Sequence, residues 1–381
     1  MPLILTGTSG LTTLDSSAGL TFSDSSNQAA AASPFGLKNR IINGDMVIDQ
    51  RNAGASVTPA NGAVTYTLDR WAFFVNQASK LTAQRNAGSV TPPAGFTNYL
   101  GVTSSSAYSV GASDRFIAQQ YIEGFNVADL GWGTANAQTV TLSFWVRSSL
   151  TGTFGGSLKN NDGTRSYPFS YTISAANTWE KETITITGDT TGTWLTNNSA
   201  GIILNFGLGT GSTFSGTAGA WVSSNLDSVT GAVSVVGTNG ATFYITGVQL
   251  ERNTTATPFE WIPYGMELAL CQRYALMIRN GTTSIDRFGL GSTVNSTTVQ
   301  LLIQHPVQMR AAPTLTTTGT ASDYAVYSVS VTTCNAAPTL GEGSQFNSRY
   351  NFVTAGGLTG GQVAQCQGAN TNAYLLLSAE L

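Results

Sequence analysis

Segments in which apolar and polar residues alternate dominate this sequence and predict an antiparallel β protein. Residues 139–147 show the pattern most clearly, with four side chains predicted to face a core: Val140, Leu142, Phe144 and Val146. Turn-forming clusters separate this segment from three others of the same kind: 182–188, 201–209 and 241–251. Strands at this spacing, with almost no helical periodicity, indicate a β-sandwich.

The first two parts of the chain differ in apolar content. Residues 1–37 carry too few apolar residues for a core of their own, so we expect an extended segment. Two alternatives stay open for it: a disordered tail, or a docking segment that orders when it trimerises or meets a partner. Residues 38–262 hold the alternating segments and are predicted to form one β-sandwich.

The last third of the chain begins with a change of pattern. Residues 263–283 are predicted to be a short helical connector, because apolar residues recur at helical spacing up to Met277 without Gly or Pro after Gly265. Residues 284–381 return to alternation and predict a smaller C-terminal β-sandwich, with strands expected at 297–304, 324–332 and 373–379. The fold class is therefore all-β with one short helix.

Composition excludes several classes of function. Only 10% of the residues are charged, against about 25% in ordinary soluble domains. Thr, Ser, Asn and Gly must cover the surface instead, which is typical of β-rich extracellular and virion proteins. With a net charge of −3 and no basic run, nucleic-acid binding is not expected. We expect neither a transmembrane helix nor a Sec signal peptide, since no long apolar stretch and no basic N-terminal region occur.

Cysteine and histidine are too scarce for most catalytic or metal sites. The three cysteines do not make a disulfide framework; Cys271 is predicted to be buried, and whether Cys334 and Cys366 pair stays open. His305 is the only histidine, and a capping or packing role is expected for it. The chain is therefore predicted to be non-enzymatic. The alternative is a polysaccharide depolymerase with paired carboxylates, for which the candidates are Asp114, Glu123, Asp129 and Asp162.

Several motifs together resemble a family of phage tail-fibre and appendage proteins. They stand at residues 39–51, 68–71, 247–252, 256–260, 267–274, 305–315 and 377–381. The order of these motifs is similar to that of a jelly roll of the carbohydrate-binding-module type followed by a C-terminal β tip. Segments 5–10 and 21–28 resemble N-terminal attachment segments of fibres.

The resemblance implies a structural virion protein that attaches a tailed phage to host cell-surface polysaccharide. It further implies a homotrimer, assembled in the host cytoplasm and joined to other tail or baseplate proteins through residues 1–37. Low charge also favours surfaces buried by self-association. An alternative that stays open is a purely structural baseplate or collar component without receptor contact.

The motif residues have a structural interpretation of their own. In Asp69-Arg70-Trp71, the large ring is predicted to anchor the core beside a strand end. Contacts between segments 249–251 and 258–260 are predicted to fasten the last strand back across the sandwich. These motifs therefore indicate scaffold rather than receptor contact.

Aromatic residues outside the clear strands are the candidates for sugar binding. In the first sandwich they are Trp132, Tyr167, Tyr171, Trp179, Trp194 and Trp221. In the C-terminal sandwich the candidates are Phe346, Arg349 and Tyr350, on a predicted loop. For each aromatic residue alone, packing at the sandwich edge is the alternative. No cofactor is expected, apart from a structural calcium ion, for which Asp45 and Asp49 are the candidates.

Overall fold

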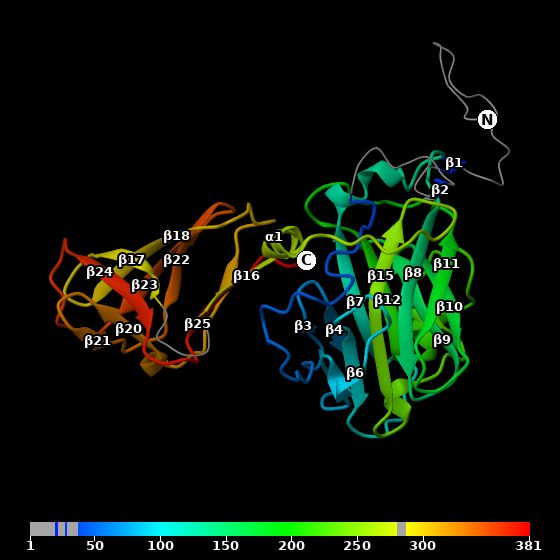
Figure 1. Ribbon diagram of the computed structural model, residues 1–381, viewed down its shortest axis with the longest axis horizontal. Helices are drawn as coiled ribbons and strands as arrows, with labels where there is room; N and C mark the ends of the chain where they lie inside the picture. The colour runs from blue at the N-terminus through cyan, green and yellow to red at the C-terminus, as the bar shows by residue number, and fades with distance from the viewer. Residues whose placement is uncertain (1–19, 22–26, 29–36, 280–286) are drawn as a thin grey trace, which may run out of the picture. The chain divides into compact units, whose positions relative to one another are not determined.

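The computed structural model describes residues 20–21, 27–28, 37–279 and 287–381 (Figure 1). The chain divides into two units, Met1–Lys38 and Asn39–Leu381. In the first unit, β1 (Leu20–Thr21) pairs antiparallel with β2 (Asn27–Gln28). The rest of the predicted attachment segment, up to residue 36, lies outside the described residues. The predicted domain boundaries stay predictions.

Two antiparallel sheets form the first sandwich of the second unit (Figure 1). The six-stranded sheet has the order β10 (Ser166–Ile173), β9 (Gly152–Lys159), β12 (Ala200–Thr210), β7 (Arg115–Glu123), β4 (Ala72–Val75), β3 (Val64–Tyr66). The five-stranded sheet has the order β11 (Glu180–Ile186), β8 (Val140–Ser148), β15 (Thr242–Glu251), β6 (Leu100–Ser104), β5 (Leu81–Arg85). The predicted antiparallel sandwich is confirmed.

Period-two alternation positions the core between these sheets. The four side chains predicted to face inward from β8 are all buried in one hydrophobic cluster, together with residues from both sheets. A two-stranded parallel pair, β13 (Ser215–Gly216) and β14 (Ser228–Val229), belongs to the long segment between β12 and β15. Short 3-10 turns lie at Ala87–Ser89, Gly124–Asn126, Ala128–Leu130, Ser212–Phe214, Val235–Gly237 and Ala321–Asp323.

The C-terminal part contains a helix and two further sheets around a second hydrophobic cluster. Helix α1 is Tyr264–Gln272, and a three-stranded sheet has the order β16 (Ala275–Arg279), β25 (Tyr374–Ser378), β19 (Thr314–Thr316). The seven-stranded sheet has the order β21 (Val331–Thr333), β20 (Tyr324–Tyr327), β24 (Val363–Gly368), β17 (Arg287–Thr293), β18 (Thr298–Gln304), β23 (Asn347–Val353), β22 (Thr339–Gly343).

Two predicted elements end elsewhere than expected. The helix stops at Gln272, because Ala275–Arg279 pairs along its whole length with β25. This tertiary pairing overrides a weak helical preference. The single strand expected at 324–332 is a hairpin of β20 and β21, in which Tyr327 pairs with Val331 around a serine-flanked turn.

Three motif side chains, Arg70, Tyr274 and Glu380, meet Glu123 of β7 at what we call the motif junction, and Glu267 of α1 makes a further contact between motifs. Arg70 is fully buried, pairs with Glu380 and lies 3.6 Å from the centroid of the Tyr274 ring. Glu123 accepts hydrogen bonds from Tyr274 Oη at 2.5 Å and from Arg273 Nε at 2.8 Å. Glu267 accepts a hydrogen bond from the backbone N–H of Asn43. The motifs therefore hold the segment after the sandwich against it.

Two predicted structural roles are confirmed. Trp71 is buried in the core, and its Nε1 donates to Asn43 O at 2.9 Å. Gln249 Oε1 accepts from Glu260 N at 2.8 Å and Glu251 Oε1 accepts from Thr257 N at 2.8 Å, so the two segments contact each other as predicted.

The cysteine thiols are free and buried. Burial raises the pKa of Cys334 to about 11 and that of Cys366 to about 12. Among the residues described, no helix is long and apolar enough to cross a membrane.

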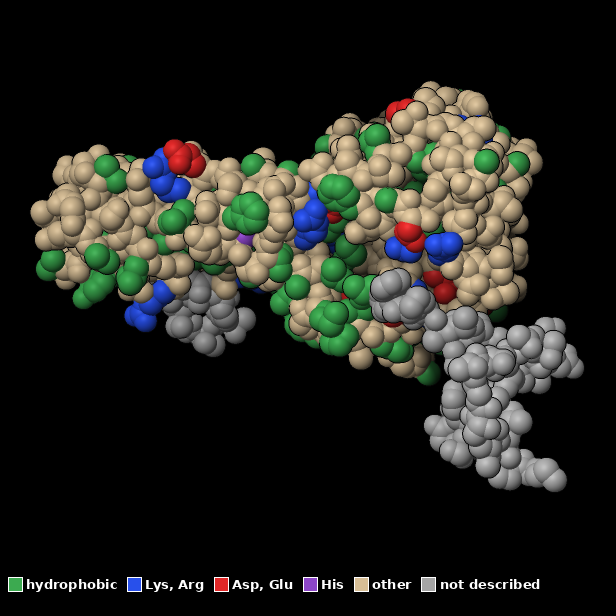
Figure 2. Space-filling model, turned by 90° about the horizontal axis from the view of Figure 1, so that it is seen from above, with side chains coloured by type: hydrophobic (Ala, Val, Ile, Leu, Met, Phe, Trp, Pro, Cys, Tyr) green, Lys and Arg blue, Asp and Glu red, His purple; other side chains and the backbone are tan. Residues whose placement is uncertain are grey.

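On the face seen in Figure 2, backbone and side chains that are neither hydrophobic nor charged cover most of the surface, and charged side chains are few. This agrees with the low charged fraction of the sequence.

Candidate functional site

The outer face of the six-stranded sheet aligns side chains from three central strands. Phe116, Ala118 and Ile122 of β7 face the core, so that Gln119 and Tyr121 between them face outward. Strand register then sets side chains of neighbouring strands beside them: Tyr121 lies opposite Ile203 of β12, which lies opposite Lys159 of β9.

A groove of about 260 Å³ lies over this row of side chains. Its lining combines aromatic rings, amides and charged groups: Val64, Phe74, Arg115, Gln119, Tyr121, Lys159, Asn161, Asp162, Gly163, Ile203 and Asn225. Gln119 Nε2 donates to Tyr121 Oη at 2.9 Å, which leaves the phenol proton free to donate in turn. Burial raises the pKa of Tyr121, so this phenol stays protonated.

A buried ion cluster forms one part of the groove wall. Asp227 is fully buried and accepts from Lys159 Nζ at 2.7 Å through Oδ1 and from Arg115 Nε at 2.5 Å through Oδ2. Lys159 Nζ also donates to Asn225 Oδ1 at 3.0 Å. Burial lowers the pKa of Lys159, and the charge of Asp227 opposes this shift.

Two glycines allow the segment that carries Asp227 to lie directly on the sheet. A Cβ at Gly155 would stand 2.5 Å from Ser228 Oγ, and one at Gly207 would stand 2.6 Å from the same atom. Because neither position carries a side chain, the backbone next to Asp227 can approach β9 and β12 closely.

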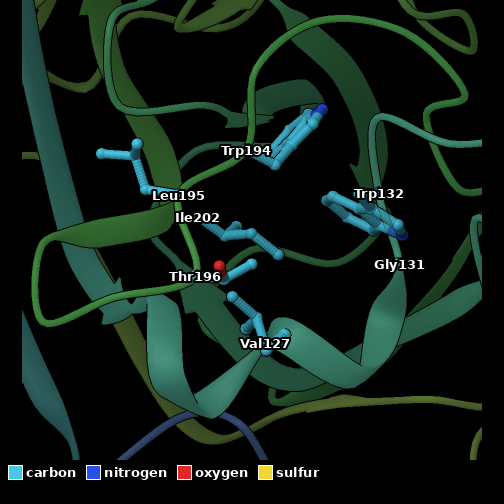
Figure 3. A pocket seen from close by; sticks show the side chains of 8 residues that line it. Val127, Gly131, Trp132, Trp194, Leu195, Thr196 and Ile202 are labelled. Carbon is cyan, nitrogen blue, oxygen red and sulfur yellow. The ribbon is translucent and has the colours of Figure 1, made fainter.

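Four of the predicted site residues pack against one another instead of lining this groove. The rings of Trp132, Trp194 and Trp221 contact each other edge-to-face at 4.8–5.3 Å between centroids, and Tyr167 contacts Trp221 at 5.3 Å. Each indole N–H donates to a backbone carbonyl. The cavity beside Trp132 and Trp194, shown in Figure 3, holds only about 30 Å³ and is too small for a sugar ring. A ligand-binding role for these rings stays a prediction.

The remaining predicted site residues lie in different surroundings. Trp179 is half-buried, and its Nε1 donates to Thr91 O at 2.9 Å. Tyr171 and Tyr350 are corrected to core residues, because both belong to the inward-facing set of their strands, β10 and β23. Phe346 is 58% exposed. Arg349 pairs with Glu342 at 3.1 Å on the outer face of the seven-stranded sheet.

The carboxylates considered for a depolymerase all bind other groups of the protein. Asp114 accepts from Tyr108 Oη at 2.7 Å, and Asp129 pairs with Arg40 at 2.7 Å. Asp162 accepts from Thr164 Oγ1 at 2.7 Å, and Glu123 belongs to the motif junction.

His305 lies within 3.1 Å of Gln345 O and 3.0 Å of Ser348 Oγ. These two contacts fit the predicted packing role.

The calcium candidates lie among hydrogen-bond donors. Asp49 accepts from the backbone N–H groups of Asn52 and Gly54, and Arg85 Nε lies 3.9 Å from it. Burial raises the pKa of Asp45. In the part of the chain that the structure describes, no three His, Cys, Asp or Glu residues group around a possible metal position. Hydrogen-bond donors surround the Asp49 carboxylate, whereas a calcium ion takes about six to eight oxygen ligands, so this position does not fit calcium.

No family model and no curated protein matches the chain. Among solved structures, the enzymatically active domain of tailspike protein 4 from bacteriophage CBA120 matches at 12% identity over 56% of this chain and 21% of the other, with a TM-score of 0.29. A putative sugar binding protein from Bacteroides thetaiotaomicron matches at 13% identity over 56% and 100%, with a TM-score of 0.31. A family 11 carbohydrate-binding module from Clostridium thermocellum matches at 11% identity over 52% and 97%, with a TM-score of 0.26. At these TM-scores the likenesses carry no argument about function.

Proposed function

We propose that this protein is a non-enzymatic, tail-fibre-type virion protein of a tailed phage that binds host surface glycans in the groove of the six-stranded sheet. The groove is the observation that supports glycan binding. The motif resemblance supports the virion half, together with a charge-poor surface.

The groove supplies the groups that sugar recognition needs. A pyranose presents an apolar ring face and several hydroxyl groups that both donate and accept hydrogen bonds. Tyr121 and Phe74 offer aromatic surface in the groove, while Gln119, Asn161 and Asn225 offer amides. The volume of the groove, about 260 Å³, lies near the lower end of ligand sites, which suits one or two units of a longer chain.

A matched pair of variants tests this assignment. Tyr121→Ala removes the central ring of the groove, whereas Phe346→Ala removes an exposed ring of the C-terminal part. We expect the first variant to bind the host polysaccharide about tenfold more weakly or worse, and the second to bind like the wild type. Titration of purified, folded proteins with host polysaccharide fragments measures both. The reverse result would move the receptor site to the C-terminal part.

Wild-type protein that binds no glycan of the host surface would instead favour the baseplate or collar role.

The assembly is proposed to be a homotrimer, with residues 1–37 joining it to other tail or baseplate proteins. Low surface charge and the fibre resemblance support this part of the proposal. Light scattering of the purified chain is expected to give three times the mass of one chain, and a monomer mass would contradict it.

A further inference from the structure

We infer that the groove selects an acidic glycan, and that Arg115, with Lys159 beside it, binds a carboxylate of that glycan. This inference rests on the proposed function and names the class of sugar that the groove takes. Three features of the groove carry it: the balance of charge, the unused hydrogen-bond donors, and the rigid placement of the guanidinium.

The charges of the ion cluster beside the groove do not cancel. Arg115 and Lys159 supply two positive charges against the single negative charge of Asp227. Asp162 also lines the groove, but it is exposed on a turn and accepts hydrogen bonds from Thr164, so water screens it. Lys159 and Asp227 are buried and are screened far less. At the ion cluster of Arg115, Lys159 and Asp227, an incoming anion therefore meets a net positive charge.

The hydrogen-bond donors of this wall outnumber its acceptors. Asp227 uses both oxygens, one for Lys159 and one for Nε of Arg115. In the part of the chain that the structure describes, Lys159 Nζ has two acceptors, which leaves one of its three protons unused. Within the described residues, the terminal nitrogens of Arg115 have no hydrogen-bond partner. An acceptor-only group such as a carboxylate matches these donors better than a hydroxyl does.

Two aromatic rings hold the Arg115 guanidinium in place. Its Cζ lies 4.9 Å from the centroid of Phe74 and 4.6 Å from that of Phe214. Together with the hydrogen bond from Arg115 Nε to Asp227, these contacts fix the plane of the guanidinium group before a ligand arrives. This lowers the entropic cost of binding. The net charge of +1 on the cluster of Arg115, Lys159 and Asp227 matches a singly charged carboxylate, as in a uronic acid, better than a doubly charged phosphate.

Paired glycans separate this inference from the proposed function. The full-length protein is titrated with a panel of uronic-acid oligosaccharides, each compared with its carboxyl-reduced form, and with phosphate-substituted oligosaccharides. We expect at least one acidic form to bind about tenfold tighter than its reduced partner, with an advantage that shrinks as salt is added. In Arg115→Gln the advantage should disappear while binding of the reduced form is kept, and Arg349→Gln should change neither.

Equal binding of acidic and reduced forms would overturn the inference and leave the proposed function standing. Preference for the phosphate-substituted glycans would overturn the choice of carboxylate. Failure of the wild-type protein to bind any glycan, neutral or acidic, would overturn both. The comparison of acidic and reduced glycans on the wild type decides the matter even if Arg115→Gln does not fold.

Discussion

Replacing Arg70 by methionine is expected to lower the free energy of unfolding by about 3–5 kcal/mol, because it removes one partner of a buried ion pair. The Glu380 side chain is 5% exposed and, among the described residues, would keep an ion pair with Arg51 alone, at 3.0 Å. The variant also loses the hydrogen bond from Arg70 to Tyr121 O and the stacking on Tyr274. Urea unfolding followed by tryptophan fluorescence measures the loss, since all seven tryptophans lie between Trp71 and Trp261.

An exposed ion pair gives a matched control for this measurement. Arg349 pairs with Glu342, whose side chain is 77% exposed, so Arg349→Met should cost only about 0–1 kcal/mol. The double variant Arg70→Met, Glu380→Gln should recover part of the loss, because the unpaired charge is gone. A loss within about 1 kcal/mol for Arg70→Met alone would show that the motif junction does not hold the fold together.

The titration of Glu267 alone is expected to lower the free energy of unfolding by about 3 kcal/mol as the pH rises from about 5 to about 8. The reason is that Glu267 holds its proton more tightly in the folded state than in the unfolded state. Burial raises the pKa of Glu267 from 4.5 to about 7, and the charges of Asp45 and Glu260 add to the shift. The stabilisation is therefore fully present below the unfolded pKa and is lost as the pH passes through the folded value. Burial likewise raises the pKa of Asp69 to about 6, which changes stability in the same direction.

Glu267→Gln tests this origin of the pH dependence. The amide keeps the acceptor for the backbone N–H of Asn43 but cannot lose a proton. Thermal melts of the variant should match the wild type near pH 5, exceed it near pH 8 and vary less in between. The same pH dependence in both proteins would assign the effect to other groups.

Local patterns predicted the strands well, because burial of one face imposes period two on each strand by itself. The same signal also existed for Tyr171, which shares its phase with Tyr167, Phe169 and Ile173 and is buried with them. The prediction of a ligand role for Tyr171 weighed the nearby turn and not this alternation. The end of the helix at Gln272 was not predictable, since it depends on pairing with β25, about 100 residues further along the chain.

The groove shows a different limit of sequence analysis. Polar residues between buried ones, as at Gln119 and Tyr121, are a local signal for an outward face, and it was missed. That Tyr121 meets Ile203 and Lys159 depends on the register of three strands. The Arg70–Glu380 pair likewise joins residues 310 positions apart. Such contacts follow from tertiary pairing and not from any local pattern.

The position of a bound glycan shows whether the groove of the six-stranded sheet is the receptor site. A crystal structure of the protein with an oligosaccharide from the host surface should show the sugar in the groove, with a ring against Tyr121 and polar contacts to Asn225 and Arg115. Sugar bound beside Phe346, or beside the three tryptophans with the groove empty, would show that the receptor site lies elsewhere on the protein.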